Sequence, residues 1–302
     1  MMPVLRRAMP YLMGGVALAS AGCESRSTER TPTGPAAAAS GPEGRLSAMA
    51  VAPPLGPAGS FGVVASSTVT NTGPTIVNGD LGVSPGNAVT GFPPGIVNGT
   101  IQLGNAASLA AQNAVTTAYN QLAGQPCDVN LTGTNLGGLT LTPGVYCFST
   151  SAQLTGTLTL NGLGNPGAVW VFKIGSTLTT ASNSRVVFIN GGQACGTFWQ
   201  VGSSATLGTT TTFAGNVLAL ASITLNTGAT NAGALFARTG AVTLDSNVVS
   251  TVGSCGSGPQ PSPTPVPTPT PPGGPVPALP LGAALALALV LLGTGAYILN
   301  RR

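Results

Sequence analysis

Charged and titratable side chains are scarce in this 302-residue sequence. It has no histidine, and aspartate, glutamate, lysine and arginine together make up 5% of the residues. Zinc sites depend largely on cysteine and histidine ligands, and general acid–base catalysis depends on histidine, carboxylates or lysine. The shortage of these groups argues against an enzyme, a metal site and a bound cofactor.

The few charges lie mostly outside the central part of the chain. The formal net charge is +4, but between residues 51 and 256 three basic and three acidic residues cancel, 3 − 3 = 0. These are Lys173, Arg185 and Arg238 against Asp80, Asp128 and Asp245. Binding to a polyphosphate backbone needs several clustered cations. A nucleic acid is therefore not an expected partner, and the shortage of titratable groups argues in the same way against a small-molecule substrate.

Glycine and proline are abundant, with 44 and 26 residues respectively. Such a composition occurs both in repetitive β-proteins and in disordered chains. However, hydrophobic residues make up 43% of the sequence and the mean hydropathy is +0.37, whereas disordered segments have low hydrophobicity. A repetitive, mostly β protein with a sizeable core is predicted.

Residues 1–23 have the three-part pattern of a secretory signal peptide: a basic start, an apolar stretch and small residues before a cleavage point. Ala19-Ser20-Ala21 fits ordinary cleavage. Alternatively, Ala21-Gly22-Cys23 resembles a lipoprotein box with Cys23 lipidated, although Ser20 stands where such boxes usually have leucine. Residues 24–54 are rich in Ser, Thr, Ala, Pro and Gly, and they are predicted to be a flexible linker.

The other end of the chain predicts a spacer followed by an anchor. Residues 257–278 contain PQPSPTPVPTPTPPGGP, whose prolines favour an extended, semi-rigid stalk. Residues 279–299 carry no charge and are long enough to span a bilayer, and two arginines follow. This arrangement also resembles the C-terminal sorting signals of bacterial surface proteins. Residues 279–302 are thus predicted to be a membrane anchor or a sorting signal of an exported protein, at the cell surface or outside the cell.

Four cysteines remain once Cys23 is assigned to the leader: Cys127, Cys147, Cys195 and Cys255. In an exported domain two disulfides are the default expectation, and three pairings are possible. Cys127 with Cys147 and Cys195 with Cys255 are favoured, because each bond would fasten a loop or a terminus to a neighbouring coil. The absence of histidine and of a Cys-x-x-Cys pair argues against zinc.

A Thr-Leu pair recurs through the central part of the chain, at residues 140, 157, 177, 206, 224 and 243. The steps are 17, 20, 29, 18 and 19 residues, and the long step contains an inserted loop at residues 191–195. A period near 19, made of short β-branched runs separated by Gly and Asn, is typical of one three-stranded turn of a β-solenoid. Strand alternation would place Leu178, Leu207, Leu225 and Leu244 inside.

Hydroxyl side chains also recur three positions after the threonine of the pair, at Thr180, Thr209, Thr227 and Ser246. In stacked coils, equivalent residues lie about 4.7 to 4.9 Å apart, so these residues predict a hydroxyl ladder. Threonine is common on exposed strands, and such a ladder alone also fits ordinary solenoid surface. The near-absence of charge on these runs favours a binding face.

One segment departs from the β pattern. Residues 105–123 place apolar side chains at helical spacing, with a possible N-cap at Asn105 and a stop at Gly124. The segment predicts one helix packed along the solenoid as part of the core.

Several motifs follow one another in a fixed order: FGVVASSTVTNTGPTIVNGDLGVSPG at residues 61–86, GFPPG at 91–95, the predicted helix, LTPGVYCF at 141–148 and GAVTLDSN at 240–247. With them, residues 55–255 resemble a widespread microbial ice-binding protein family that folds as a discontinuous, three-sided β-solenoid with a helix alongside. The match covers about two thirds of the chain.

The resemblance implies a mostly β domain over residues 55–256, a right-handed three-sided β-solenoid with one long α-helix packed alongside. It implies adsorption to ice crystal surfaces through a flat, Thr-rich face, for antifreeze action, recrystallisation inhibition or adhesion to ice. Some family members carry a Thr-Ala/Gly-x-Thr/Asn motif there, which residues 180–183 and 227–230 match and residues 209–212 match in part. The predicted ice-binding residues are Thr180, Asn183, Thr209, Thr212, Thr227 and Thr230.

Two other functions compete with ice binding. A surface adhesion or structural module without ice activity would use the same stalk and anchor. A polysaccharide-acting β-helix enzyme would need two carboxylates across a cleft, and between residues 51 and 256 the sequence has Asp80, Asp128 and Asp245 but no glutamate. No catalytic residue, metal or cofactor is therefore predicted.

Overall fold

A computed structural model describes residues 49–253 and 255 of the chain. The predicted signal peptide (1–23), stalk (257–278) and C-terminal segment (279–302) lie outside the described residues, as does most of the predicted linker (24–54). Within the described part, no helix is both long and apolar enough to cross a membrane.

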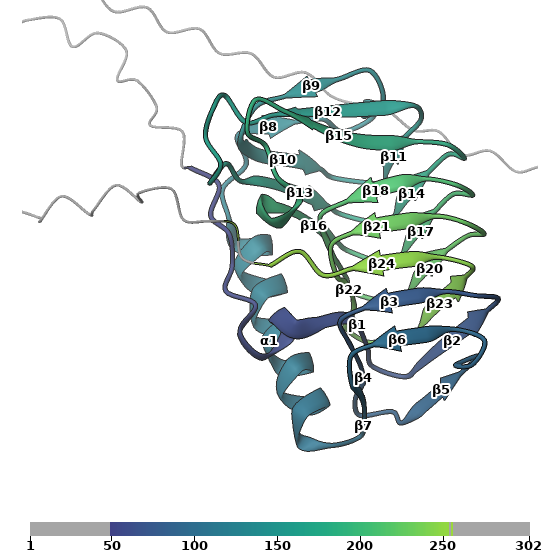
Figure 1. Cartoon of the computed structure of the whole chain (residues 1–302). Helices are drawn as coiled ribbons and strands as arrows, with labels where there is room; N and C mark the ends of the chain where they lie inside the picture. The colour runs from purple at the N-terminus through teal and green to yellow at the C-terminus, as the bar shows by residue number, and fades with distance from the viewer. Residues whose placement is uncertain (1–48, 254, 256–302) are drawn as a thin grey trace, which may run out of the picture. The chain divides into compact units, whose positions relative to one another are not determined.

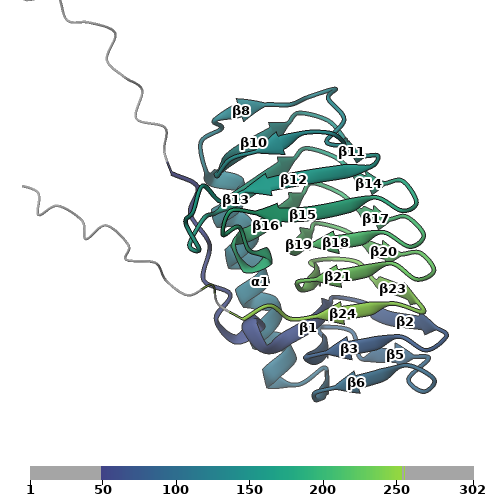
Figure 2. The same ribbon diagram turned by 45° about the horizontal axis from the view of Figure 1, so that its top comes forward.

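The described residues form three parallel sheets that wrap around one core (Figures 1 and 2). Sheet A has the spatial order β7 (Ile101–Leu103), β4 (Asp80–Val83), β1 (Phe61–Ala65), β22 (Leu235–Ala237), β19 (Asn216–Ala219), β16 (Thr197–Val201), β13 (Trp170–Ile174), β10 (Gly144–Phe148), β8 (Val129–Asn130). Sheet B has the order β11 (Ala152–Leu154), β14 (Leu178–Thr180), β17 (Ala205–Leu207), β20 (Ile223–Leu225), β23 (Val242–Asp245), β2 (Thr68–Thr72), β5 (Ala88–Thr90). Sheet C has the order β6 (Ile96–Asn98), β3 (Ile76–Asn78), β24 (Val248–Ser250), β21 (Thr230–Ala232), β18 (Thr212–Ala214), β15 (Arg185–Ile189), β12 (Thr157–Asn161), β9 (Thr140–Leu141).

Apart from the two ends of the stack, where β7 stands alone and β8 and β9 lack a partner strand in sheet B, each coil contributes one strand to each sheet in the order A, B, C, which confirms the predicted three-sided solenoid. The order of coils in space differs from their order in the chain. The last coil, β22 to β24, pairs with the first coil, β1 to β3, through Leu235 opposite Val63 and Val248 opposite Ile76. The described part of the chain thus enters and leaves the solenoid in the middle of the stack, and the solenoid is discontinuous.

The interior is filled by the alternate side chains of the strands. Leu178, Leu207, Leu225 and Leu244 are all buried, as the Thr-Leu repeat predicts. Inside sheet A, aromatic rings in register form a ladder, in which Phe172 stacks on Trp199 at 3.9 Å between ring centroids and on Tyr146 at 5.6 Å. Parallel ladders of this kind fix the position of each coil on the next.

Helix α1 (Ala106–Gly124) confirms the predicted helix within one residue at each end. Its N-cap is Asn105, whose side chain accepts the backbone N–H of Ser108 while the Ser108 hydroxyl accepts the N–H of Asn105. A second apolar cluster joins α1 to the outer side of sheet A, with Val115 and Leu122 packed together with Phe236. A short 3-10 helix, η1 (Gly56–Ser60), packs beside α1.

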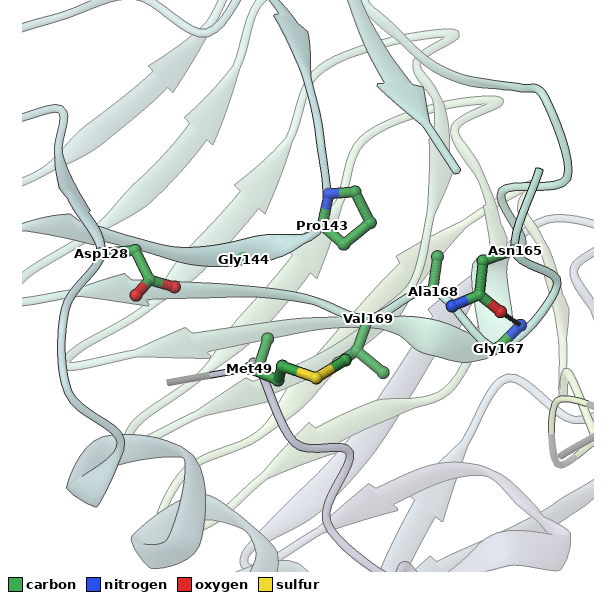
Figure 3. Close-up of a pocket in the computed structure, with 9 residues that line it drawn as sticks. Met49, Asp128, Pro143, Gly144, Asn165, Gly167, Ala168 and Val169 are labelled. Atoms are coloured by element: carbon green, nitrogen blue, oxygen red, sulfur yellow. Dashed lines mark hydrogen bonds between the residues drawn. The ribbon is translucent and has the colours of Figure 1, made fainter. Parts of the chain in front are cut away.

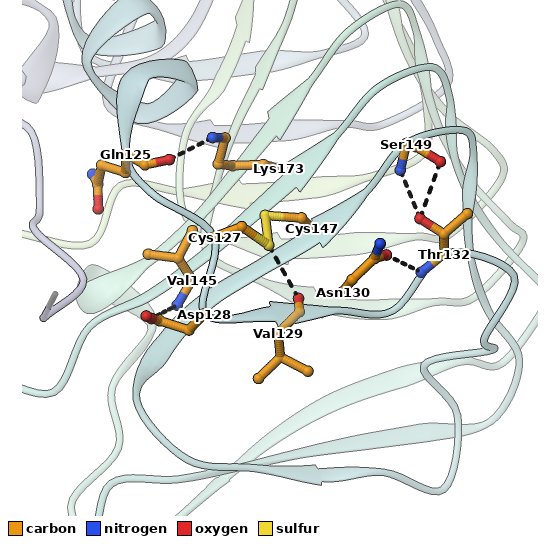
Figure 4. Close-up of a disulfide and its surroundings, with 10 residues drawn as sticks. All are labelled: Gln125, Cys127, Asp128, Val129, Asn130, Thr132, Val145, Cys147, Ser149 and Lys173. Carbon is orange, nitrogen blue, oxygen red and sulfur yellow. Dashed lines mark hydrogen bonds between the residues drawn. A yellow bond between two sulfur atoms is a disulfide. The ribbon is translucent and has the colours of Figure 1, made fainter. Parts of the chain in front are cut away.

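Both favoured disulfides are present, Cys127–Cys147 and Cys195–Cys255, with Cα atoms 6.0 and 5.3 Å apart. Figure 4 shows the first bond, which joins the segment after α1 to strand β10. The second bond begins in the inserted loop, where η2 (Ala194–Gly196) connects β15 to β16. Each bond fastens a loop or the last described residue to a coil, as predicted.

Candidate functional site

The three sides of the solenoid differ in what they expose. Sheet A is covered by α1, and its central strands β1, β16, β19 and β22 are buried throughout. Sheet C exposes a mixed row in register: Thr157, Arg185, Thr212, Thr230, Val248, Ile76 and Ile96. This row combines a cation with a group of exposed apolar side chains. Sheet B differs from both.

Sheet B presents one threonine from each of six consecutive coils. Strand pairing places them in a single row: Thr179, Thr206, Thr224, Thr243, Thr70 and Thr90. All six are exposed or half-buried, and their strand neighbours Leu178, Leu207 and Leu244 face inward. The row continues onto Gln153 of β11 at one end of the sheet. We call the outward side of sheet B, with this row at its centre, the threonine face.

A second row of small side chains runs beside the first, two residues earlier in the chain, at the start of each strand or just before it: Ser151, Thr177, Ser204, Ser222, Ala241, Thr68 and Ala88. Hydroxyls in this row bond to one another or to the backbone, as when Thr177 donates to Ser151 at 2.8 Å and Thr68 donates to the carbonyl of Ala88 at 3.0 Å. The two rows contain no large side chain. The threonine face is therefore flat across both.

Asp245 is the single charged residue in the strands of sheet B. It lies at the end of β23, at the edge of the face, and its carboxylate accepts hydrogen bonds from the hydroxyls of Thr227 and Ser246. The threonine rows themselves carry no charge. A surface with this composition holds few strongly hydrated groups.

Five of the six predicted ice-binding residues lie along the corner between sheets B and C, not on the flat face. Asn183, Thr209 and Thr227 sit in the turns at this corner and are exposed. Thr212 and Thr230 begin strands of sheet C, opposite each other in register. Contact of these residues with ice stays a prediction.

Thr180 requires a correction, because its side chain is 3% exposed and faces the interior. Its hydroxyl lies 2.9 Å from that of Thr211 and accepts the backbone N–H of Gly208 at 2.8 Å. The physical reason is strand alternation: in β14 the outward residue is Thr179, and Leu178 and Thr180 point inward. A step of three residues from an outward threonine leaves the strand and reaches the corner.

Sequence reasoning missed the residues at the centre of the threonine face. The available signal was the threonine of the Thr-Leu repeat itself at 206, 224 and 243, each followed by a buried leucine. Thr70 and Thr90 carried no such signal, because neither belongs to a Thr-Leu pair. Only the pairing of the first coil with the last brings them into the same row.

Figure 3 shows a depression at the corner between sheets C and A, lined by Met49, Pro143 and Val169 among others. Its one carboxylate, Asp128, accepts the backbone N–H of Val145 at 2.8 Å. Among the described residues, no group of three His, Cys, Asp or Glu side chains is placed to hold a metal ion. The depression thus offers a ligand one carboxylate that already has a structural partner.

Comparisons with known proteins agree on one family. The family model described as "Ice-binding-like" matches residues 63–250. An ice-binding protein of Nostoc sp. (strain HG1) is 57% identical over 207 residues, which are 68% of this chain and 76% of that protein. The crystal structure of an ice-binding protein from the Antarctic ascomycete Antarctomyces psychrotrophicus matches 68% of this chain and all of its own, with 43% identity and a TM-score of 0.66. A structure that describes the antifreeze activity of an ice-binding protein from an Arctic yeast matches 68% of this chain and 97% of its own, with 28% identity and a TM-score of 0.62.

Proposed function

Since this chain belongs to the ice-binding-like family, we propose that it adsorbs to ice through the threonine face. The observation that carries the proposal is the uninterrupted row of six threonines on six consecutive coils, from Thr179 to Thr90. Neighbouring members of such a row lie about 4.8 Å apart, the spacing of paired strands. A regular array on this scale is suited to a crystalline partner.

The chemistry of threonine supports this role. Each side chain offers a hydroxyl that donates and accepts a hydrogen bond, and a methyl group that does not compete for water. The row therefore anchors water at regular intervals and leaves the spaces between free of strong hydration. Charged groups would hold water in their own shells, and the rows of the threonine face contain none.

Rigidity is the second requirement, because ordering side chains during adsorption would cost free energy. The strands under the threonine face are paired on both sides from β14 to β2, and leucines buried at 0 to 1% exposure hold them from inside. Threonine is β-branched and has few rotamers on a strand. The face is thus arranged before it meets ice, and the consequence is inhibition of crystal growth or attachment to the crystal.

The proposal has no place for catalysis. The three carboxylates of the described residues have structural partners: Asp80 accepts the N–H of Thr100, Asp128 that of Val145, and Asp245 the hydroxyl of Thr227. They come from different parts of the fold, since Asp80 begins β4, Asp128 precedes β8 and Asp245 ends β23. Glycoside hydrolysis needs two carboxylates that face each other across a cleft. The contacts of these three carboxylates do not favour such a pair.

The test is uptake of the purified full-length chain into a slowly growing ice hemisphere. We expect uptake of the natural chain, exclusion of a Thr206→Lys variant, and uptake of a Thr157→Lys variant, which places the same charge on sheet C. Exclusion of the natural chain would leave a structural or adhesive module without ice activity as the better explanation. Equal uptake of both lysine variants would assign ice binding to another face.

A further inference from the structure

The two places where the chain leaves the described domain lie at the same corner of the solenoid. Met49 and Ala50 line the depression formed by residues that connect sheet C to sheet A, such as Pro143 between β9 and β10 and Asn165 between β12 and β13. Cys255 is bonded to Cys195, which lies in the connection from β15 to β16, again between sheets C and A.

In a three-sided solenoid, the corner between sheets C and A is the one opposite sheet B. The threonine face and the two chain exits are therefore on opposite sides of the domain. Figures 1 and 2 show this arrangement: strands β14, β17 and β20 lie on one side, and the first described residues lie on the other, near α1.

Both exits are fastened to the domain. On the N-terminal side, the backbone of Val51 and the side chain of Gln125 form a pair of hydrogen bonds, 2.9 Å from the Val51 N–H to Oε1 and 2.7 Å from Nε2 to the Val51 carbonyl. On the C-terminal side the fastening is covalent, through Cys195–Cys255. A force applied to the chain after residue 255 is therefore transmitted through the disulfide to the inserted loop, and not only along the backbone to strand β24.

We infer that the domain is built to bind ice while its flanking segments are held at another surface, so that the protein attaches its carrier to ice. The inference rests on the proposed function and adds a partner: the cell surface, on the side of the domain opposite the threonine face. The sequence beyond Cys255 supplies a proline-rich spacer over residues 257–278 and an uncharged stretch over residues 279–299, suited to such a tether. Export to the cell surface is part of this proposal.

The test compares points of attachment with the full-length chain coupled to streptavidin beads. A Cys23→Ser background carries one biotinylated cysteine, placed after Arg302, at Gln121 on the exposed side of α1, or at Thr179 on the threonine face. Each protein is first checked unattached for uptake into ice. The beads are then brought to a growing ice front, and the number retained is counted.

We expect beads coupled after Arg302 and beads coupled at Gln121→Cys to adhere, and beads coupled at Thr179→Cys to be rejected roughly tenfold or more, because many copies per bead engage ice at once. If the unattached chain fails to enter ice, the proposed function fails. If it enters ice but beads coupled after Arg302 do not adhere, only the tethering inference fails. Equal adhesion of Thr179→Cys beads would also overturn it.

Discussion

Replacing Thr224 by tyrosine distinguishes the threonine face from the neighbouring corner. Thr224 is the third of the six threonines in the row, between Thr206 and Thr243. An aromatic ring there projects well beyond the short side chains of the neighbouring threonines, because side chains on a strand stand roughly perpendicular to the sheet. A planar crystal surface that meets the ring loses contact with the threonines on either side.

The longest uninterrupted run in the row falls from six threonines to three, namely Thr243, Thr70 and Thr90. Adsorption requires that the favourable free energy of many simultaneous contacts exceed the free-energy cost of association. We therefore expect thermal hysteresis at equal concentration to fall roughly twofold or more. Tyrosine favours strands, and a surface substitution changes stability by about 0.5 kcal/mol or less. In a domain of this size the melting temperature would then shift by about 2 °C at most.

The matched control is Thr227→Tyr, three residues later in the same coil, where the exposed side chain belongs to the corner. Thermal hysteresis and melting temperature are measured for both variants and the natural chain. We expect the corner variant to keep its hysteresis. The opposite pattern, with loss in Thr227→Tyr and none in Thr224→Tyr, would refute the assignment of the threonine face and restore the corner residues as the ice-binding set.

Three further predictions concern stability. Replacing both Cys195 and Cys255 by alanine is expected to lower the free energy of unfolding by about 4 kcal/mol, and replacing Cys127 and Cys147 by about 3 kcal/mol, because the Cys195–Cys255 bond spans 60 residues and the Cys127–Cys147 bond spans 20. Denaturant unfolding measures both losses. A larger loss for the Cys127–Cys147 pair would contradict the chain-entropy explanation. Phe172→Ala is expected to cost about 3 to 5 kcal/mol, since the ring is fully buried between Tyr146 and Trp199; a loss below 1 kcal/mol in the same assay would show that the ladder does not hold the coils. Burial raises the pKa of the Tyr146 hydroxyl above 10.0. The stability that this shift contributes is therefore complete below pH 10.0 and is lost as the pH rises through the higher pKa of the folded state. Denaturant titrations over this pH range are expected to show a smaller loss of stability in a Tyr146→Phe variant than in the natural chain.

Much of the fold could be predicted from the sequence, although the Thr-Leu pairs do not all occupy one position of the coil: those at 140 and 157 lie in sheet C, and those at 206, 224 and 243 lie in sheet B. The Thr-Leu pair marked the alternation that buries Leu207 and Leu225, and the capping residues marked the start of α1 at Asn105. The cysteine pairing followed from the idea that each bond fastens a loop or an end. The repeat and the helix cap are local features, in which a few consecutive residues decide the structure.

The site was harder to predict because it depends on where each strand ends. The difference between Thr179, which points out, and Thr180, which points in, is one residue, and a shift of one residue reverses every side chain on a strand. The turn that follows carries Asn183 at a φ of 61°, and no repeat in the sequence announces it. Thr70 and Thr90 needed the pairing of coils 173 residues apart, as in the contact between Thr70 and Thr243, which a local pattern does not contain.

The discontinuous order of coils makes the threonine row depend on the last coil, because Thr243 joins Thr70 to Thr224. Coils from β10 onward pair with the next coil along the chain, as Val217 does with Leu235 after 18 residues, so their pairing partners are near in the sequence. The first two coils pair with each other early, but their place in the stack does not exist until β22 to β24 have formed. Before that moment Thr70 and Thr90 stand apart from Thr179, Thr206 and Thr224. A chain interrupted before Val242 would hold two short rows and no continuous one, so the surface proposed to meet ice exists only in a chain that has finished folding.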